Sequence, residues 1–118
     1  MGYMEPTKED KVQLKRIIKR GILRRCEHWL QETILLINKE YDDQENSFDR
    51  CMEITKRSRD FHNEAMRREN YYSNSMMLSG VGVLLAEGYL TLEDIADCRE
   101  EVQDAIRRCA TDFDWANR

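Results

Sequence analysis

One stretch of the chain, residues 76 to 86, is apolar on every side of a helix, so the rest of the chain must be arranged to cover it. Small residues recur along it at steps of three and four, which places Ser75, Ser79, Gly82 and Ala86 on one narrow helical face. This pattern predicts a buried central helix that a second helix backbone approaches closely. The stretch is far shorter than the roughly 20 residues that span a bilayer.

The pattern before this stretch predicts one long helix over about residues 8 to 41. Thr7 is the expected N-cap, and Asp10 stands where a capping box needs a side-chain acceptor. Apolar residues at helical spacing, Leu14, Ile17, Ile18, Ile22 and Trp29, support it. From Trp29 onward apolar residues cover most of the circumference, so this half must be buried from more than one side.

A second helix is predicted over about residues 47 to 87, ending where Gly88 can adopt the left-handed conformation of a C′ residue. The run Tyr-Tyr-Ser-Asn-Ser at 71 to 75 lowers helix propensity but contains no true breaker. We therefore expect one continuous helix, with a break near Ser73 as the alternative.

A third helix is predicted over about residues 92 to 111, with Thr91 as its N-cap. Leu90 and Ile95 stand at the two positions of a hydrophobic staple around that cap. The opening of this segment has the cadence of a helix-turn-helix unit, but no glycine follows to make the turn, so we interpret it as one helix.

These elements predict an all-α fold in which a long antiparallel helical hairpin and a shorter C-terminal helix form a helical bundle. A four-helix bundle results if the second helix breaks near Ser73. The 118 residues have the usual size of a single domain, and the composition, 36% charged and 41% hydrophobic with one proline, is that of a helical protein. The N-terminus lacks the pattern of a secretory signal, so we expect a cytoplasmic protein.

Four widely spaced cysteines, Cys26, Cys51, Cys98 and Cys109, are expected to be reduced, although their even number leaves a disulfide framework open. No Glu-x-x-His pair for a di-iron site is present, and a zinc site at Cys26 and His62 would have too few ligands. No nucleophile stands with a base and an orienting group. We therefore predict no enzyme, no cofactor and no metal.

Charge is segregated along the chain. Residues 8 to 25 contain eight basic and two acidic residues, whereas residues 26 to 53 contain two basic and eight acidic ones. The basic half-helix is expected to lie against acidic faces of the same fold or of a second copy. The alternative is a nucleic-acid or anion-binding face formed by Lys11, Lys15, Arg16, Lys19, Arg20 and Arg24. The overall charge of −4 opposes such binding.

The helix lengths predict that the third helix is too short to cover the whole hairpin, which leaves residues 25 to 65 as a two-helix arm. Such an arm needs a partner, and its predicted interface comprises Trp29, Leu30, Ile34, Leu35, Leu36, Ile37, Phe48 and Met52. We expect a homodimer with Leu35 and Leu36 near its two-fold axis. The predicted function is a non-enzymatic protein–protein interaction module. It is expected to bind an unidentified protein as well as its own copy, and no membrane. A small molecule held among Tyr71, Tyr72, Met76 and Met77 stays open as an alternative.

Overall fold

The computed structural model describes residues 4–39 and 46–117. Its first element, α1 (Lys8–Asn38), is a single long helix. The predicted capping box is confirmed, since the backbone N–H of Asp10 donates to Thr7 Oγ1 and the N–H of Thr7 donates to Asp10 Oδ2. Two backbone donors at the start of α1 are therefore satisfied by local side chains.

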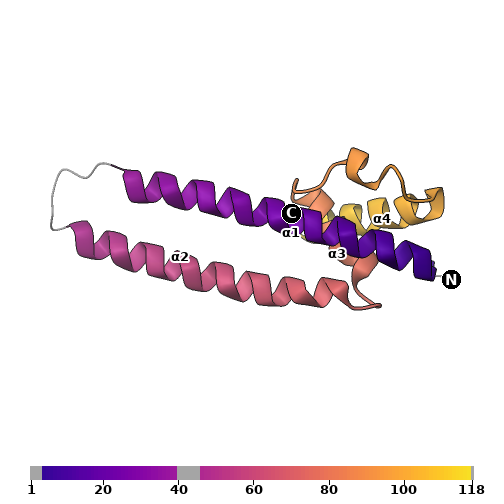
Figure 1. Ribbon diagram of the computed structural model, residues 1–118, viewed down its shortest axis with the longest axis horizontal. Helices are drawn as coiled ribbons and strands as arrows, with labels where there is room; N and C mark the ends of the chain where they lie inside the picture. Colours follow the sequence, from indigo (N-terminus) through magenta and orange to yellow (C-terminus); the bar gives the residue numbers. More distant parts are fainter. Residues whose placement is uncertain (1–3, 40–45, 118) are drawn as a thin grey trace.

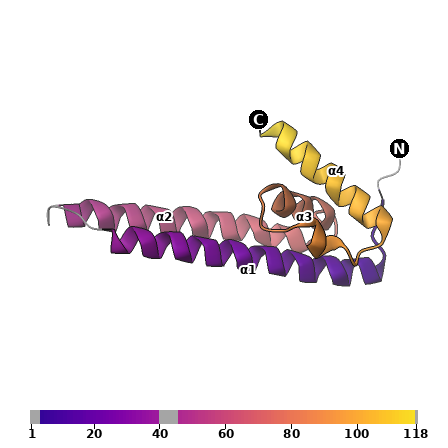
Figure 2. The same ribbon diagram turned by 90° about the horizontal axis from the view of Figure 1, so that it is seen from above.

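The helix α2 (Asn46–Arg68) runs antiparallel beside the outer half of α1, and the two form a long arm (Figure 1). The other helices gather at the opposite end, on one side of the α1–α2 layer (Figure 2). The molecule is elongated, with extents of 59 × 25 × 21 Å and a radius of gyration of 17.7 Å. A compact chain of this length has a radius of gyration of about 13 Å. The predicted all-α helical bundle is confirmed. Its hydrophobic core lies at one end of the molecule and does not extend along the arm.

That core surrounds α3 (Met77–Ala86), which lies between α1 and α4 (Glu100–Ala116) and packs on both. The stretch predicted to be the buried centre does lie there, with Met77, Val81 and Leu84 fully buried. Fully buried partners come from α1, from the segment between α3 and α4, and from α4: Leu14, Ile18, Ile95, Val102 and Ile106. We call this end, with the first half of α1, the body.

The close approach predicted for the small-residue face occurs at Gly82. A Cβ atom added there would lie 2.5 Å from Cβ of Cys109 and 2.9 Å from the backbone nitrogen of Ala110. Contacts this short mean that α4 crosses α3 almost backbone to backbone. At the end of α3, Gly88 has φ of 87°, the left-handed C′ conformation that the sequence predicts.

The continuous helix over residues 47 to 87 was the wrong prediction, and the alternative break near Ser73 is present. α2 is followed by a 3₁₀ turn, η1 (Glu69–Tyr72), and then by an extended residue at Ser73. The break lets α3 fold back, so that the Tyr71 ring fills the space over Gly80, where an added Cβ would lie 2.6 Å from its Cγ atom. Helix propensity alone favours a continuous helix only slightly over a break at these residues, and packing against the body favours the break.

The single helix predicted over residues 92 to 111 is also corrected. Thr91 caps only the 3₁₀ turn η2 (Leu92–Ile95), and α4 begins at Glu100. Between them Gln103 Nε2 donates to the carbonyls of Ala96 and Cys98, which satisfies backbone left open by the interruption. The predicted end of the last helix near Thr111 is also too early, because α4 continues to Ala116. The Thr111 hydroxyl donates to the Arg107 carbonyl within the helix.

Replacing Gly82 with alanine tests the crossing of α3 and α4. The added methyl group has no room, so Gly82→Ala is expected to lower the free energy of unfolding by about 1 to 3 kcal/mol. Urea denaturation monitored by circular dichroism measures this. Ser75→Ala is the control, because Ser75 is exposed just before α3 and its truncation needs no added space. Equal stability of Gly82→Ala and wild type would contradict the close crossing.

Candidate interaction surface on the helical arm

The interior of the arm contains few apolar contacts. The rings of Trp29 and Phe61 stack with their centroids 4.8 Å apart, and Thr33 is buried with its hydroxyl donating to the Trp29 carbonyl. Among the residues of α2, only Arg68 is fully buried. A two-helix hairpin with so little internal burial is marginally stable alone.

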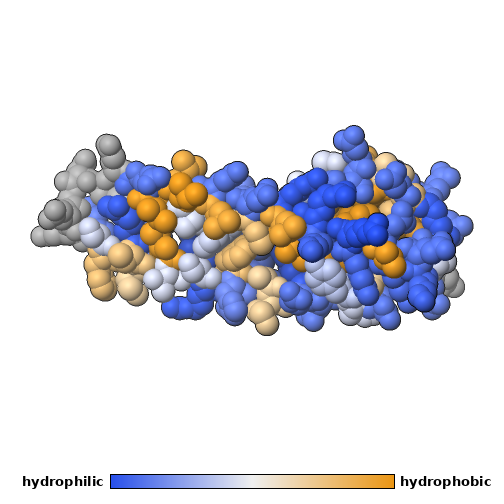
Figure 3. Space-filling model, in the orientation of Figure 1, coloured by the Kyte–Doolittle hydropathy of each residue, from blue (hydrophilic) through white to orange (hydrophobic). Residues whose placement is uncertain are grey.

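The apolar residues that the arm does not bury form a row on the outer side of α1. Leu23, Leu30, Ile34 and Ile37 are 48% to 54% exposed, and we call them the apolar row. Their spacing of three, four and seven residues places them on one face. This face lies about half a turn from Gly21, which contacts α3, so the body cannot cover it. Figure 3 shows hydrophobic residues along the arm.

The eight residues predicted to form a partner interface divide into two sets. Trp29 and Leu36 are only partly exposed, and Trp29 stacks within the arm. The other six are exposed large hydrophobic side chains: Leu30, Ile34, Leu35, Ile37, Phe48 and Met52. Leu35, at 73% exposed, points about 100° away from Ile34 and therefore lies outside the apolar row.

A charged network joins the arm to the body. The buried Arg68 donates through Nη1 and Nη2 to the Glu87 carboxylate at 2.9 and 3.1 Å, and its Nε lies 3.4 Å from Glu64 Oε2. Arg25 donates to Glu64 from α1 at 2.9 and 3.2 Å. Burial alone would lower the pKa of Arg68, but its hydrogen bonds to Glu87 raise it. The network thus keeps a buried guanidinium charged and fixes the angle between α2 and α3.

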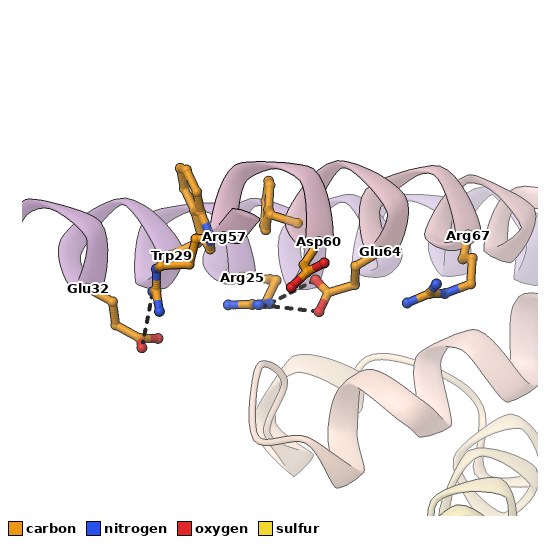
Figure 4. Close-up of a pocket in the computed structure, with 8 residues that line it drawn as sticks. Arg25, Trp29, Glu32, Arg57, Asp60, Glu64 and Arg67 are labelled. Carbon is orange, nitrogen blue, oxygen red and sulfur yellow. Dashed lines mark hydrogen bonds and ion pairs between the residues drawn. The ribbon is translucent and has the colours of Figure 1, made fainter. Parts of the chain in front are cut away.

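A groove of about 310 Å³ runs beside this network, on the side of the arm that faces α3 (Figure 4). Its charges are balanced, because its lining comprises three arginines, three carboxylates and the aromatic pair: Arg25, Arg57, Arg67, Glu32, Asp60, Glu64, Trp29 and Phe61. Arg57 Nη2 lies 3.4 Å from Glu32 Oε2, and its buried Nε has no hydrogen-bond partner in the described chain. Charges of both signs dominate this face.

The residues predicted to form an anion-binding face also divide. Arg20 and Arg24 lie against Asp94 of η2, with Nη1 of Arg24 2.6 Å from Asp94 Oδ2. This agrees with the prediction that part of the basic half-helix meets an acidic group of the same fold. The remaining residues form no ion pair within residues 4–39 and 46–117: Lys11, Lys15, Arg16 and Lys19.

A second long-range pair fixes the start of α4 to the start of α1. Arg99 donates through Nε and Nη2 to the Asp10 carboxylate at 2.9 to 3.2 Å. These hydrogen bonds lower the pKa of Asp10, and those from Arg24 lower the pKa of Asp94. Asp10 and Asp94 are each the acidic residue of a capping box. Each also binds an arginine of a distant segment, and we call these two contacts the clamps at Asp10 and Asp94.

The chemistry open to other residues is limited. The four cysteines are free thiols, of which Cys51 is exposed on the arm and Cys98 is buried in the core. Burial raises the pKa of the Cys98 and Cys109 thiols, which disfavours a reactive thiolate. Across residues 4–39 and 46–117, no three metal-ligating side chains converge. None of the described helices is long and apolar enough to cross a membrane.

Comparison of the chain with protein-family models, with curated proteins and with solved structures finds no match. The candidate surface therefore has to be argued from its own geometry.

Sequence reasoning did not find the network at Arg68. The step of four from Glu64 to Arg68 is a recognisable helical pair, but nothing in the spacing points to Arg25 or Glu87. Tyr71, which was considered for a small ligand, contacts Arg68, whose guanidinium lies 5.8 Å from the centroid of the Tyr71 ring.

The clamp at Asp94 predicts a loss of stability in acid. Its folded-state pKa lies below the unfolded value of about 3.9, so its contribution is present above that value and is lost as the pH falls further. Asp94→Asn is expected to cost about 1 to 2 kcal/mol at pH 7, because both arginine partners are half exposed.

Thermal melting of wild type and Asp94→Asn between pH 7 and pH 2 measures this effect, and the variant should show the flatter pH dependence. Asp97→Asn is the matched control, since Asp97 is exposed and its carboxylate has no partner in the described chain. An equal pH dependence of wild type and Asp94→Asn would contradict the clamp.

Proposed function

We propose that the protein is a non-enzymatic protein–protein interaction module that forms a homodimer through the apolar row of its arm. The observation that carries this proposal is that half-exposed leucines and isoleucines line α1 where the body cannot reach, while α2 has no fully buried apolar residue. Contiguous apolar surface of this kind is characteristic of association sites. Phe48 and Met52, 72% and 51% exposed, are further exposed apolar side chains on α2.

Association also supplies what the arm lacks as a folded unit. A second arm laid on the apolar row would complete a four-helix bundle, in which the thin Trp29–Phe61 interior gains a neighbouring apolar layer. In this arrangement the apolar row lies at the two-fold axis. Leu36 is half-buried and Leu35 points elsewhere, so neither is central to the contact.

The alternative, an anion- or nucleic-acid-binding face on α1, is less well supported. Two of its six proposed residues, Arg20 and Arg24, already bind Asp94. The protein as a whole is acidic, with a net charge of −4, which opposes such binding.

Ile34→Glu tests the proposed dimer. A carboxylate at the centre of an apolar interface has no partner, so this variant is expected to be a monomer of 14.1 kDa. The wild-type protein should have twice that mass under the same conditions. Size exclusion with light scattering gives both masses, and circular dichroism verifies that the helices persist.

Leu92→Glu is the matched control, because Leu92 is 56% exposed on η2 and lies on the body. It should remain a dimer. A wild-type protein that is monomeric at every concentration tested, or a dimer that Ile34→Glu leaves intact, would refute the proposed interface.

A further inference from the structure

Basic side chains continue the line of the apolar row toward the start of α1. Lys8, Lys15, Arg16 and Lys19 are exposed and form no ion pair in the described chain, and we call them the basic row. Lys19 lies four residues and Arg16 seven residues before Leu23, so both point in nearly the direction of that leucine. Lys15 precedes Lys19 by four residues, and Lys8 precedes Lys15 by seven. One face of α1, about 44 Å long, therefore runs from basic to apolar on the side away from the body.

The helix α2 adds side chains to the same side of the α1–α2 layer. The groove that faces α3 is lined by three charged residues of α2: Asp60, Glu64 and Arg67. At 100° per residue, Phe48 and Met66 point about 140° away from the mean direction of those three, and Arg59 about 120°. All of them are exposed, and Arg59 forms no ion pair in the described chain. Apolar and basic side chains of both helices therefore share the side away from the body.

The carboxylates of the two helices lie at the margins of this side or on the opposite one. On α1, Glu9 and Glu27 point about 60° from the direction opposite to Gly21, at the outer edge of the layer. Asp10 binds Arg99 of the body, and Glu32 lines the groove that faces α3. The carboxylates of α2 all point within about 40° of the groove: Asp49, Glu53, Asp60 and Glu64. The side away from the body is therefore locally cationic.

This side of the layer is open. In Figure 1, α1 passes in front of α3 and α4, and Figure 2 shows the body on one side of the layer only. Figure 3, in the same view as Figure 1, therefore looks onto the side away from the body, with hydrophobic residues over the arm. A planar surface can contact α1 here without meeting the body.

A straight line of cations followed by apolar side chains matches the surface of an anionic lipid bilayer. Such a surface presents phosphate groups in a plane with hydrocarbon just beneath them, so both kinds of side chain find a partner in any register. A nucleic acid offers phosphates to the basic row but no hydrocarbon to the apolar row. The net charge of −4 opposes the contact only in part, because salt screens exposed charges beyond about 10 Å.

We infer that this side binds the surface of an anionic lipid bilayer, with α1 parallel to the membrane plane. The basic row lies at the lipid phosphates, and the apolar row inserts between the headgroups. The sequence prediction of no membrane rests on the shortness of the stretch 76 to 86, and surface binding needs no spanning helix. The inference goes beyond the proposed homodimer: a second copy and a bilayer cover the same apolar row, so the two contacts exclude each other on one molecule.

Co-sedimentation with vesicles tests this inference. The wild-type protein is expected to sediment with phosphatidylcholine vesicles that contain about 30% phosphatidylserine, and to remain in the supernatant with phosphatidylcholine alone. Lys15→Gln with Lys19→Gln should lower the partition coefficient about tenfold or more, because each basic residue near an anionic surface contributes to binding. Neither side chain has an ion pair in the described chain, so the fold and the mass in solution should not change.

Arg107→Gln with Arg108→Gln is the matched control, because it removes the same charge from α4, on the other side of the layer. It should leave the partition coefficient nearly unchanged. A wild-type protein that stays in the supernatant with the anionic vesicles would overturn the inference. So would equal binding to phosphatidylcholine alone, or equal binding by the two double variants.

Light scattering on the same samples without vesicles tests the homodimer separately. A dimer that does not bind anionic vesicles overturns only the membrane contact, and a monomer that binds them overturns only the dimer. A mobility shift of duplex DNA gives one further outcome. Retention of DNA by a protein that does not bind the vesicles would assign the basic row to nucleic acid and overturn the inference.

The orientation at the bilayer is measurable by fluorescence quenching with lipids that carry a nitroxide on the acyl chain. A label on Leu30→Cys, in a Cys51→Ser background, should be quenched, because Leu30 belongs to the apolar row. A label on Thr111→Cys in the same background should not be, because Thr111 is exposed on α4. Equal quenching of the two labels would overturn the proposed orientation.

Discussion

The backbone crossing of α3 and α4 at Gly82 is the contact on which the body depends. Because no Cβ atom separates the two helices there, α4 lies close enough for Val102 and Ile106 to be fully buried in the core that surrounds α3. That contact requires α3 to leave the direction of α2, which is why the chain breaks near Ser73 instead of continuing as one helix. The arm is therefore left uncovered as a consequence of how the core is made.

The charged groups follow from the same arrangement. Where apolar contact ends, arginines form long-range pairs: Arg99 with Asp10 at the end of the body, Arg24 with Asp94 at its middle, and Arg68 with Glu87 at the base of the arm. Such pairs contribute modest stability each when they are exposed. Their shared effect is to fix short segments, η2 above all, that have little apolar surface of their own.

Local rules predicted the parts of this fold that depend on neighbouring residues. The cap at Thr7, the left-handed Gly88 and the apolar centre at 76 to 86 all follow from spacing and backbone preference. The break near Ser73 does not follow from such rules, because it depends on tertiary packing, of Tyr71 on Gly80 and of α4 on α3, that no periodicity encodes. The exposure of the apolar row could be foreseen from helix lengths, but its separation from Leu35 needed the position of the body on α1.

The continuity of α1 through both halves of the molecule has a mechanical consequence. Because α1 is one continuous helix from the core to the arm, the direction in which the apolar row faces is fixed by the way α1 packs in the body. One residue more or less between Gly21 and Leu30 would turn that face by about 100°. Seven residues, added to α1 and matched in α2, would turn it by only about 20°. The arm can therefore become longer or shorter by about two helical turns at a time while the same face of α1 stays directed away from the body.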